Sequence, residues 1–123
     1  MNYNTIVQET INEIPEFGEN YTISLEKDDI DSESGPHTVF SFVFVPLLKK
    51  AMTNNKELVE RMYAFLEKME CSGNSDVAEV VEFTVLEELC DEYRDSELEV
   101  YLQPETRLAL KAIRKYMPEQ LLL

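Results

Sequence analysis

The side chains of this 123-residue sequence that could take part in chemistry are one histidine, two cysteines and twenty-five carboxylates. The histidine, His37, follows Pro36 at the expected start of a helix. A histidine that acts as a general base needs a nucleophile and a group that orients its ring, and the sequence offers no identifiable set of these. We therefore expect His37 to be a surface or capping residue, and we expect the chain to have no catalytic residues and not to be an enzyme.

Acidic residues at three alternate positions, Asp29, Asp31 and Glu33, have the spacing that begins an EF-hand calcium loop. The rest of the loop does not fit this motif. Its sixth position is Ser34 where the turn needs glycine, and its twelfth is Phe40 where the ion needs a bidentate glutamate. The sequence therefore does not predict a calcium site here.

The other potential metal ligands do not form a known type of site. Cys71 and Cys90 with one histidine are too few for a structural zinc site. A carboxylate metal centre in a helical bundle requires Glu-x-x-His pairs, and the sequence contains none. Because a Gly-rich phosphate loop is also absent from the sequence, we expect no metal and no cofactor.

Apolar residues at helical spacing dominate the elements that must position these side chains. They predict an all-α fold, either a single-domain bundle or a short armadillo-like stack of about five to six helices, with residues 1–123 as one domain. The expected helices cover residues 5–14, 37–52, 56–70, 76–95 and 104–117, with 96–103 as a short helix or an extended connection. Pro46 is expected to kink or divide the second of them, and Asn54 or Asn55 to cap the third.

Two segments are expected to lie outside these helices. Residues 17–35 predict an acidic loop region, in which 21–25 could form a short strand. The apolar end, residues 118–123, should dock on the body of the protein or support a homo-oligomer. The sequence shows no apolar run of about 20 residues and no secretory signal, so we expect a cytoplasmic protein.

The formal net charge of −14 is unevenly distributed. Residues 1–36 carry nine acids and one base, and residues 72–99 carry ten acids and one base. The segments 37–71 and 100–123 have net charges of +1 and +2. Such a chain should not bind nucleic acid or an anionic membrane, because both are negatively charged. A basic protein is the partner that its field would attract.

Aromatic residues beside clustered acids indicate where that partner would bind. The expected contact surface covers thirteen residues in two acidic segments. The first segment contributes Asp28, Asp29, Asp31 and Glu33; the second contributes Glu87, Glu88, Asp91, Glu92, Tyr93, Asp95, Glu97, Glu99 and Tyr101.

The stretches HTVFSFVFVPLLKKAM and VAEVVEFTVLEELCDE, within residues 36–117, resemble small helical bacterial proteins of toxin–immunity systems, including contact-dependent inhibition. This resemblance implies one-to-one binding and neutralisation of a cognate toxin, commonly a basic nuclease and here preferably an RNase. It transfers no residue roles, because immunity families share no catalytic residues. The alternatives are an acidic adaptor or regulatory subunit, a homo-oligomeric structural protein and an unrecognised enzyme.

Overall fold

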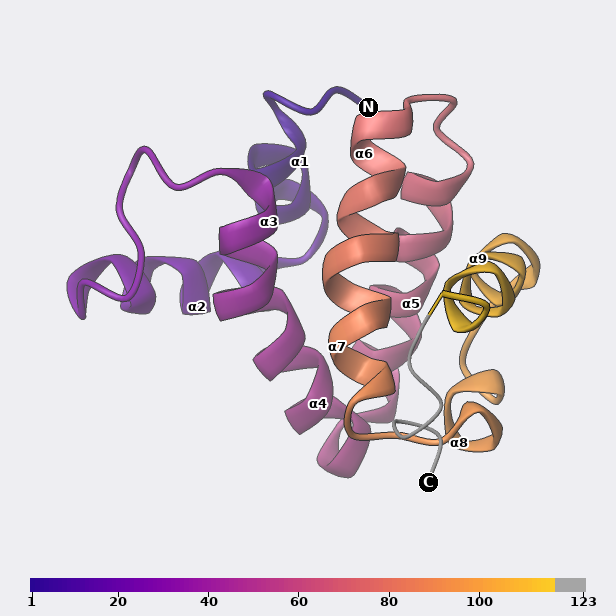
Figure 1. Cartoon of the computed structure of the whole chain (residues 1–123). Helices are drawn as coiled ribbons and strands as arrows, with labels where there is room; N and C mark the ends of the chain where they lie inside the picture. Colours follow the sequence, from indigo (N-terminus) through magenta and orange to yellow (C-terminus); the bar gives the residue numbers. More distant parts are fainter. Residues whose placement is uncertain (117–123) are drawn as a thin grey trace.

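The computed structural model describes residues 1–116, which form seven helices and no strand. The first two are α1 (Ile6–Glu13) and α2 (Pro15–Glu26). A long helix follows as α3 (Pro36–Val39), the π-helical segment η1 (Phe40–Phe44) and α4 (Val45–Asn54). After α5 (Lys56–Glu70), a second long helix comprises α6 (Ser75–Val80), the π-helical segment η2 (Val81–Leu86) and α7 (Glu87–Cys90). The short α8 (Asp95–Glu99) and α9 (Pro104–Arg114) complete this part of the chain (Figure 1).

The all-helical bundle expected from the sequence is thus confirmed, although it has more helices than the expected five to six. None of the helices in residues 1–116 has the length and apolar character needed to cross a membrane. The expected tail, residues 118–123, lies outside the described residues.

The additional helix is α2, so the prediction that residues 17–35 form a loop, with a possible strand at 21–25, was wrong. Pro15 opens this helix at a position where a missing N–H costs little. Its Phe17, Tyr21 and Leu25 follow at intervals of four and contact the core. The stripe is only one residue wide, which is why the sequence pattern looked weak. The loop itself is limited to residues 27–35, and the buried side chain of Ile30 attaches it to the body.

Pro46 does not divide the first long helix, which continues from Pro36 to Asn54. Directly before the proline, the N–H of Val45 bonds to the carbonyl of Phe40, five residues earlier. Proline has no N–H with which to continue the regular pattern, and a wider π turn accommodates such an interruption. The disturbance that the sequence predicted is therefore a π segment within a continuous helix.

The second long helix ends at Cys90, about one turn earlier than expected from residues 76–95. It contains a π segment that no proline or glycine announces in the sequence. The two π segments pack against each other, and the Nδ1 atom of His37 lies 2.7 Å from the Oγ1 atom of Thr84. His37 is therefore a half-buried bridge between the two long helices, not the expected surface or capping residue.

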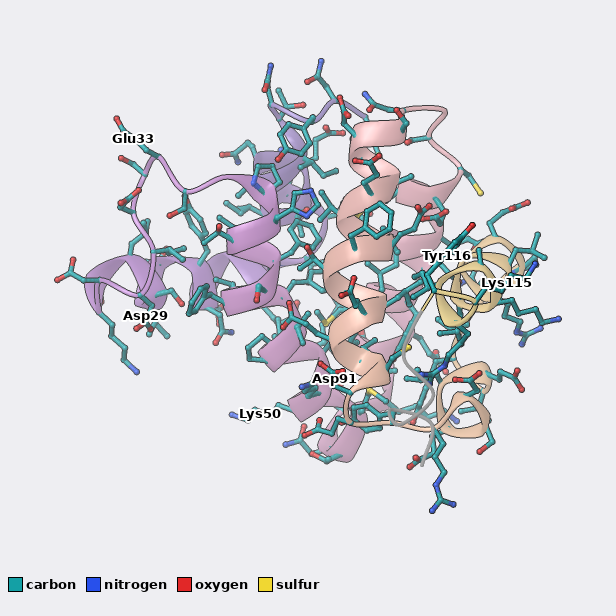
Figure 2. All side chains as sticks on the ribbon, in the orientation of Figure 1. Asp29, Glu33, Lys50, Asp91, Lys115 and Tyr116 are labelled. Carbon is teal, nitrogen blue, oxygen red and sulfur yellow. The ribbon has the colours of Figure 1, made fainter. Side chains whose placement is uncertain are left out.

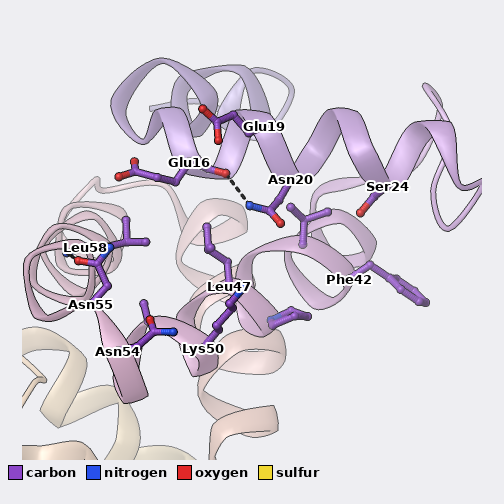
Figure 3. A pocket seen from close by; sticks show the side chains of 13 residues that line it. Glu16, Glu19, Asn20, Ser24, Phe42, Leu47, Lys50, Asn54, Asn55 and Leu58 are labelled. Atoms are coloured by element: carbon purple, nitrogen blue, oxygen red, sulfur yellow. Dashed lines mark hydrogen bonds between the residues drawn. The ribbon is translucent and has the colours of Figure 1, made fainter.

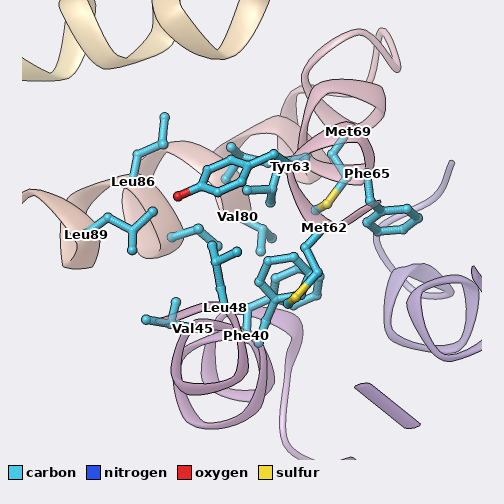
Figure 4. Packing of buried hydrophobic residues seen from close by; sticks show 14 of the residues in the cluster. Phe40, Val45, Leu48, Met62, Tyr63, Phe65, Met69, Val80, Leu86 and Leu89 are labelled. Atoms are coloured by element: carbon cyan, nitrogen blue, oxygen red, sulfur yellow. The ribbon is translucent and has the colours of Figure 1, made fainter. Parts of the chain in front are cut away.

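A single hydrophobic core joins these helices to α5, whose expected apolar stripe is confirmed. Met62, Tyr63 and Leu66 of α5 are buried, and Figure 4 shows the α5 side chains facing those of the two long helices. Asn55 begins α5 as expected, because its side chain accepts a hydrogen bond of 3.1 Å from the N–H of Leu58.

The last helix, α9, is rotated relative to the apolar face that the sequence predicts, which consists of Leu108, Ala109, Ala112, Ile113 and Tyr116. Ala109 and Ile113 are buried as expected, but Leu108 and Tyr116 are largely exposed, whereas Thr106 and Leu110 are buried. The rotation follows from the start of the helix, where the Glu67 carboxylate accepts hydrogen bonds from the N–H groups of Glu105 and Thr106 and from the Thr106 hydroxyl.

We predict that Phe17→Ala destabilises the protein by about 3–5 kcal/mol, because Phe17 is fully buried. Its ring centroid lies 5.9 Å from that of Phe40 and 6.0 Å from that of Phe44, so it attaches α2 to the first long helix. Denaturant unfolding monitored by circular dichroism measures the change. The matched control is Phe83→Ala, at a side chain that is 58% exposed, where a change within about 0.5 kcal/mol is expected. Equal losses for both variants would contradict this packing.

Candidate protein-binding surface

The two predicted acidic segments lie on different sides of the bundle. Asp29 and Glu33 project from the loop between α2 and α3, whereas Asp91 lies beyond the end of α7, with the first long helix between them (Figure 2). The thirteen predicted residues therefore form two separate surfaces instead of one.

The first surface consists of the four exposed acids of the loop, Asp28, Asp29, Asp31 and Glu33. The Asp31 carboxylate accepts a hydrogen bond of 2.8 Å from the N–H of Glu33, which gives the loop a defined turn. No ion pair joins any of these acids to another residue of the described part of the chain.

The second surface contains acids of two kinds, and those of the first kind are engaged within the protein. Glu92 forms an ion pair of 3.3 Å with Lys49, and the Asp95 carboxylate accepts a hydrogen bond of 2.7 Å from Arg114. Glu97 accepts a hydrogen bond of 2.9 Å from the N–H of Arg94 at the start of α8. These three predicted residues stabilise the fold, so their carboxylates are less available to a partner.

The acids of the second kind are Glu87, Asp91 and Glu99, which are exposed, together with the half-buried Glu88. Within residues 1–116 their carboxylates form no ion pair. The sequence could not separate the two kinds, because it records where charges occur but not which cations the fold places beside them.

The two predicted tyrosines differ in their surroundings. Tyr93 is half-buried and packs against the core. Tyr101 is also half-buried, and its ring stacks on Tyr63 with centroids 5.1 Å apart and ring planes at 6°. Tyr63 is buried, and its hydroxyl donates to the sulfur of Met52 at 3.3 Å. Burial, and then the neighbouring Tyr101, raises the pKa of Tyr63, so this residue stays a neutral support for the exposed part of Tyr101.

Two hollows that the sequence did not predict meet at Tyr101. One, of about 380 Å³, is lined by Lys56, Glu60, Tyr63, Val100, Tyr101 and Gln103. The other, of about 430 Å³, lies against the turn between α4 and α5 and shares Lys56 and Tyr101 with the first. The largely exposed Val100 follows Glu99 directly. The second surface therefore includes a hollow that combines the rings of Tyr63 and Tyr101 and the side chain of Val100 with one acid, Glu60, and one base, Lys56.

Two half-buried neighbouring carboxyls, those of Glu70 and Glu82, lie apart from these hollows. The Oε2 atom of Glu70, at the end of α5, is buried without a hydrogen-bond partner among the residues that the structure describes. Burial, and then the adjacent Glu82 carboxyl, raises the pKa of Glu70 to about 8. The Glu70 carboxyl is therefore mostly protonated at neutral pH.

Metal-binding and thiol chemistry find little support in the described residues. Across residues 1–116, no three His, Cys, Asp or Glu side chains form a group that could hold a metal ion. Both cysteines are free thiols, and burial raises the pKa of Cys90 to about 11, so Cys90 is protonated at neutral pH.

The chain belongs to a protein family described as a domain of unknown function (DUF7674), whose pattern matches residues 7–122. Comparison with curated proteins and with solved structures finds no match to this chain. The family assignment thus supports one continuous domain and leaves its function to be inferred from the surfaces described above.

We predict that Glu70→Gln makes the protein more stable above pH 8 and leaves its stability nearly unchanged at pH 5. The folded state binds a proton between the ordinary glutamate pKa and about 8 that the unfolded chain has released, so stability falls as the pH rises through this window. Because Glu70 is only half-buried, solvent screening should limit the gain to about 1 kcal/mol.

Denaturant unfolding at pH 5, 7 and 8.5 measures this effect. The control is Glu79→Gln, at an exposed position of α6, which should leave the pH dependence unchanged. If Glu70→Gln and the original protein lose stability equally between pH 5 and 8.5, the folded state does not bind an additional proton at Glu70.

Proposed function

We propose that this member of a family of unknown function binds and neutralises a basic protein, specifically the cognate domain of a bacterial toxin with nuclease and preferably RNase activity. The observation that carries the proposal is the second surface, where the exposed carboxylates of Glu87, Asp91 and Glu99 form no ion pair within residues 1–116. The hollow at Tyr101 begins at Val100, directly after Glu99. The sequence resemblance to immunity proteins contributes the toxin as the partner.

Physical reasons favour this surface as an inhibitor of a nuclease. The active site of such an enzyme attracts phosphates, so a cluster of carboxylates can occupy the position of the substrate backbone. Opposite net charges also accelerate encounter, which matters for a protein that must capture a toxin before it acts.

The hollow at Tyr101 adds what charge alone does not provide. Binding energy in protein interfaces is concentrated in buried aromatic and apolar anchors surrounded by polar residues. Tyr101 is oriented in advance by its stack on Tyr63, so little side-chain entropy is lost when a partner covers it. An apolar side chain of the toxin, flanked by lysine or arginine, matches the hollow and the adjacent Glu99.

The same charge favours a one-to-one complex with a different protein over self-association. Two copies at −14 each repel, whereas a basic toxin domain reduces the net charge of the complex. We place the complex in the cytoplasm, where a nuclease would meet its substrate. An acidic adaptor would use the same surface, and relief of toxicity distinguishes the two functions.

We predict that the combined charge reversals Glu87→Lys, Asp91→Lys and Glu99→Lys reduce the association rate with the partner by roughly 10- to 100-fold at low ionic strength. The difference should shrink at high salt. These positions are chosen because, unlike Glu92 and Asp95, they have no ion pair with a residue between 1 and 116 whose loss would disturb the fold. Biosensor kinetics with the protein that co-purifies from the native cell measures the rate.

The matched control carries the same charge change in and beside the loop, as Glu26→Lys, Asp29→Lys and Glu33→Lys, and it leaves Asp28, with its φ of 61°, unchanged. In parallel, each variant is co-expressed with the toxic product of a neighbouring gene, and cell growth measures neutralisation. The second-surface variant should fail to restore growth, and the loop variant should restore it. Full protection by both variants would exclude the second surface, and the lack of any neighbouring toxic product would count against the immunity function.

A further inference from the structure

A groove separates α2 from the first long helix, on the side of the bundle that carries the acidic loop. Its volume is about 330 Å³. Figure 3 shows it between α2, which carries Glu19, Asn20 and Ser24, and α4, which carries Leu47, Lys50 and Asn54.

The floor of this groove is apolar and partly exposed. Val43, Leu47 and Leu58 form part of it, and Leu47 points upward into the open space (Figure 3). Phe42 extends it at one end with 55% of its side chain exposed, although it lies in a helix whose neighbouring side chains are buried. An exposed apolar side chain by itself, such as Phe83, needs no partner, but beside a groove the exposed Phe42 ring offers an anchor for an apolar ligand.

The α2 side of the groove is fixed before any partner arrives. The side-chain amide of Asn20 donates a hydrogen bond of 2.9 Å to the carbonyl of Glu16, which leaves the Asn20 oxygen free to accept. Arg61 of α5 donates to the Glu16 carboxylate at 3.1 Å and holds the pKa of that carboxyl below its usual range. Together with the Phe17 ring beneath, these contacts set the width of the groove.

The two rims of the groove have opposite charges. On the α2 rim, the acids that line the groove are Glu19, which is exposed, and Glu16, which pairs with Arg61. On the other rim lies the exposed Lys50, whereas its neighbour Lys49 pairs with Glu92. The groove therefore has an apolar centre between an acidic and a basic edge.

We propose that this groove binds the apolar face of an amphipathic helix from a protein partner, with basic residues beside α2 and acidic or neutral residues beside Lys50. An apolar stripe between charged edges is the usual ligand of such a groove. The chain's own end, PEQLLL, has one acid and no base, so it does not match the acidic rim. A second copy at −14 is disfavoured for the same reason. The inference rests on the proposed function only for the source of the helix. The groove shares Ala51, Asn54 and Asn55 with one hollow at Tyr101, but its two rims and Phe42 lie outside that hollow.

The test uses two synthetic helical peptides of about 14 residues, or about four turns. Both have one leucine face. The edge meant for α2 carries lysine in the first and glutamate in the second, and the opposite edge carries glutamine in both. Each is titrated into the ¹⁵N-labelled full-length protein at about 0.15 M salt. The lysine peptide should saturate and shift the amide signals of α2, η1 and α4, and the glutamate peptide should not bind.

Four variants separate specific docking from general attraction to an acidic protein. Phe42→Ala should reduce the affinity for the lysine peptide roughly tenfold. Phe83→Ala removes a similarly exposed ring outside the groove and should leave this affinity unchanged. Glu19→Lys should weaken binding of the lysine peptide, and Glu79→Lys, with the same change in net charge on α6, should not. A fifth variant, Lys50→Glu, should strengthen binding of the lysine peptide.

The outcomes are distinguishable from those of the proposed function. The charge-reversed Glu87, Asp91 and Glu99 variant should lose partner binding and still bind the peptide in the groove. Signal shifts confined to residues 87–101, shifts spread over the surface without saturation, or equal losses for Phe42→Ala and Phe83→Ala would overturn the groove as a docking site. Such results would leave neutralisation through the second surface unaffected.

Discussion

Contact between the two long helices is the constraint on which the rest of the structure depends. Both helices widen into a π turn where they meet, and the side chains of His37 and Thr84 join them there. Below this contact, Phe40 and Phe44 stack with centroids 4.8 Å apart and receive Phe17 from α2. The position of α2, and hence the groove beside it, follows from this aromatic packing. π turns frequently occur near functional sites, and here they orient Phe42 and Phe83 outward while their neighbours remain in the core.

The fold also divides the acidic residues into those it uses and those it leaves exposed. Twenty-four of the twenty-five acids occur between residues 1 and 116, and five of them form ion pairs with described bases. The Glu67 carboxylate instead stabilises the N-terminus of α9, where a helix dipole favours negative charge. Carboxylates that serve neither purpose carry the remaining negative charge of the protein. At Glu70, burial first and then the neighbouring Glu82 carboxyl raise the pKa.

The two candidate contact regions differ in the chemistry they offer. The surface around Tyr101 combines acids with an aromatic ring that is supported from behind by Tyr63, which suits a compact basic epitope. The groove beside α2 has apolar residues at its floor and opposite charges on its rims, which suits a helix. The two regions adjoin at the C-terminal end of α4, where Ala51, Asn54 and Asn55 line both the groove and one hollow at Tyr101.

The sequence by itself determined the helical class and most helix positions, and it offered Asn55, beside Asn54, as the cap of α5, because helical spacing and capping are local properties of the chain. It also shows where the acidic segments lie. Only the tertiary structure decided that α2 is a helix. Its apolar stripe of Phe17, Tyr21 and Leu25 is too narrow to be recognised in the sequence, and it is evident only where α2 packs against the first long helix. The rotation of α9, the engagement of Glu92 and Asp95, and both concave sites were likewise decided by residues distant in sequence. Charge and periodicity can be read along a chain, whereas pairing and concavity arise when separate helices meet.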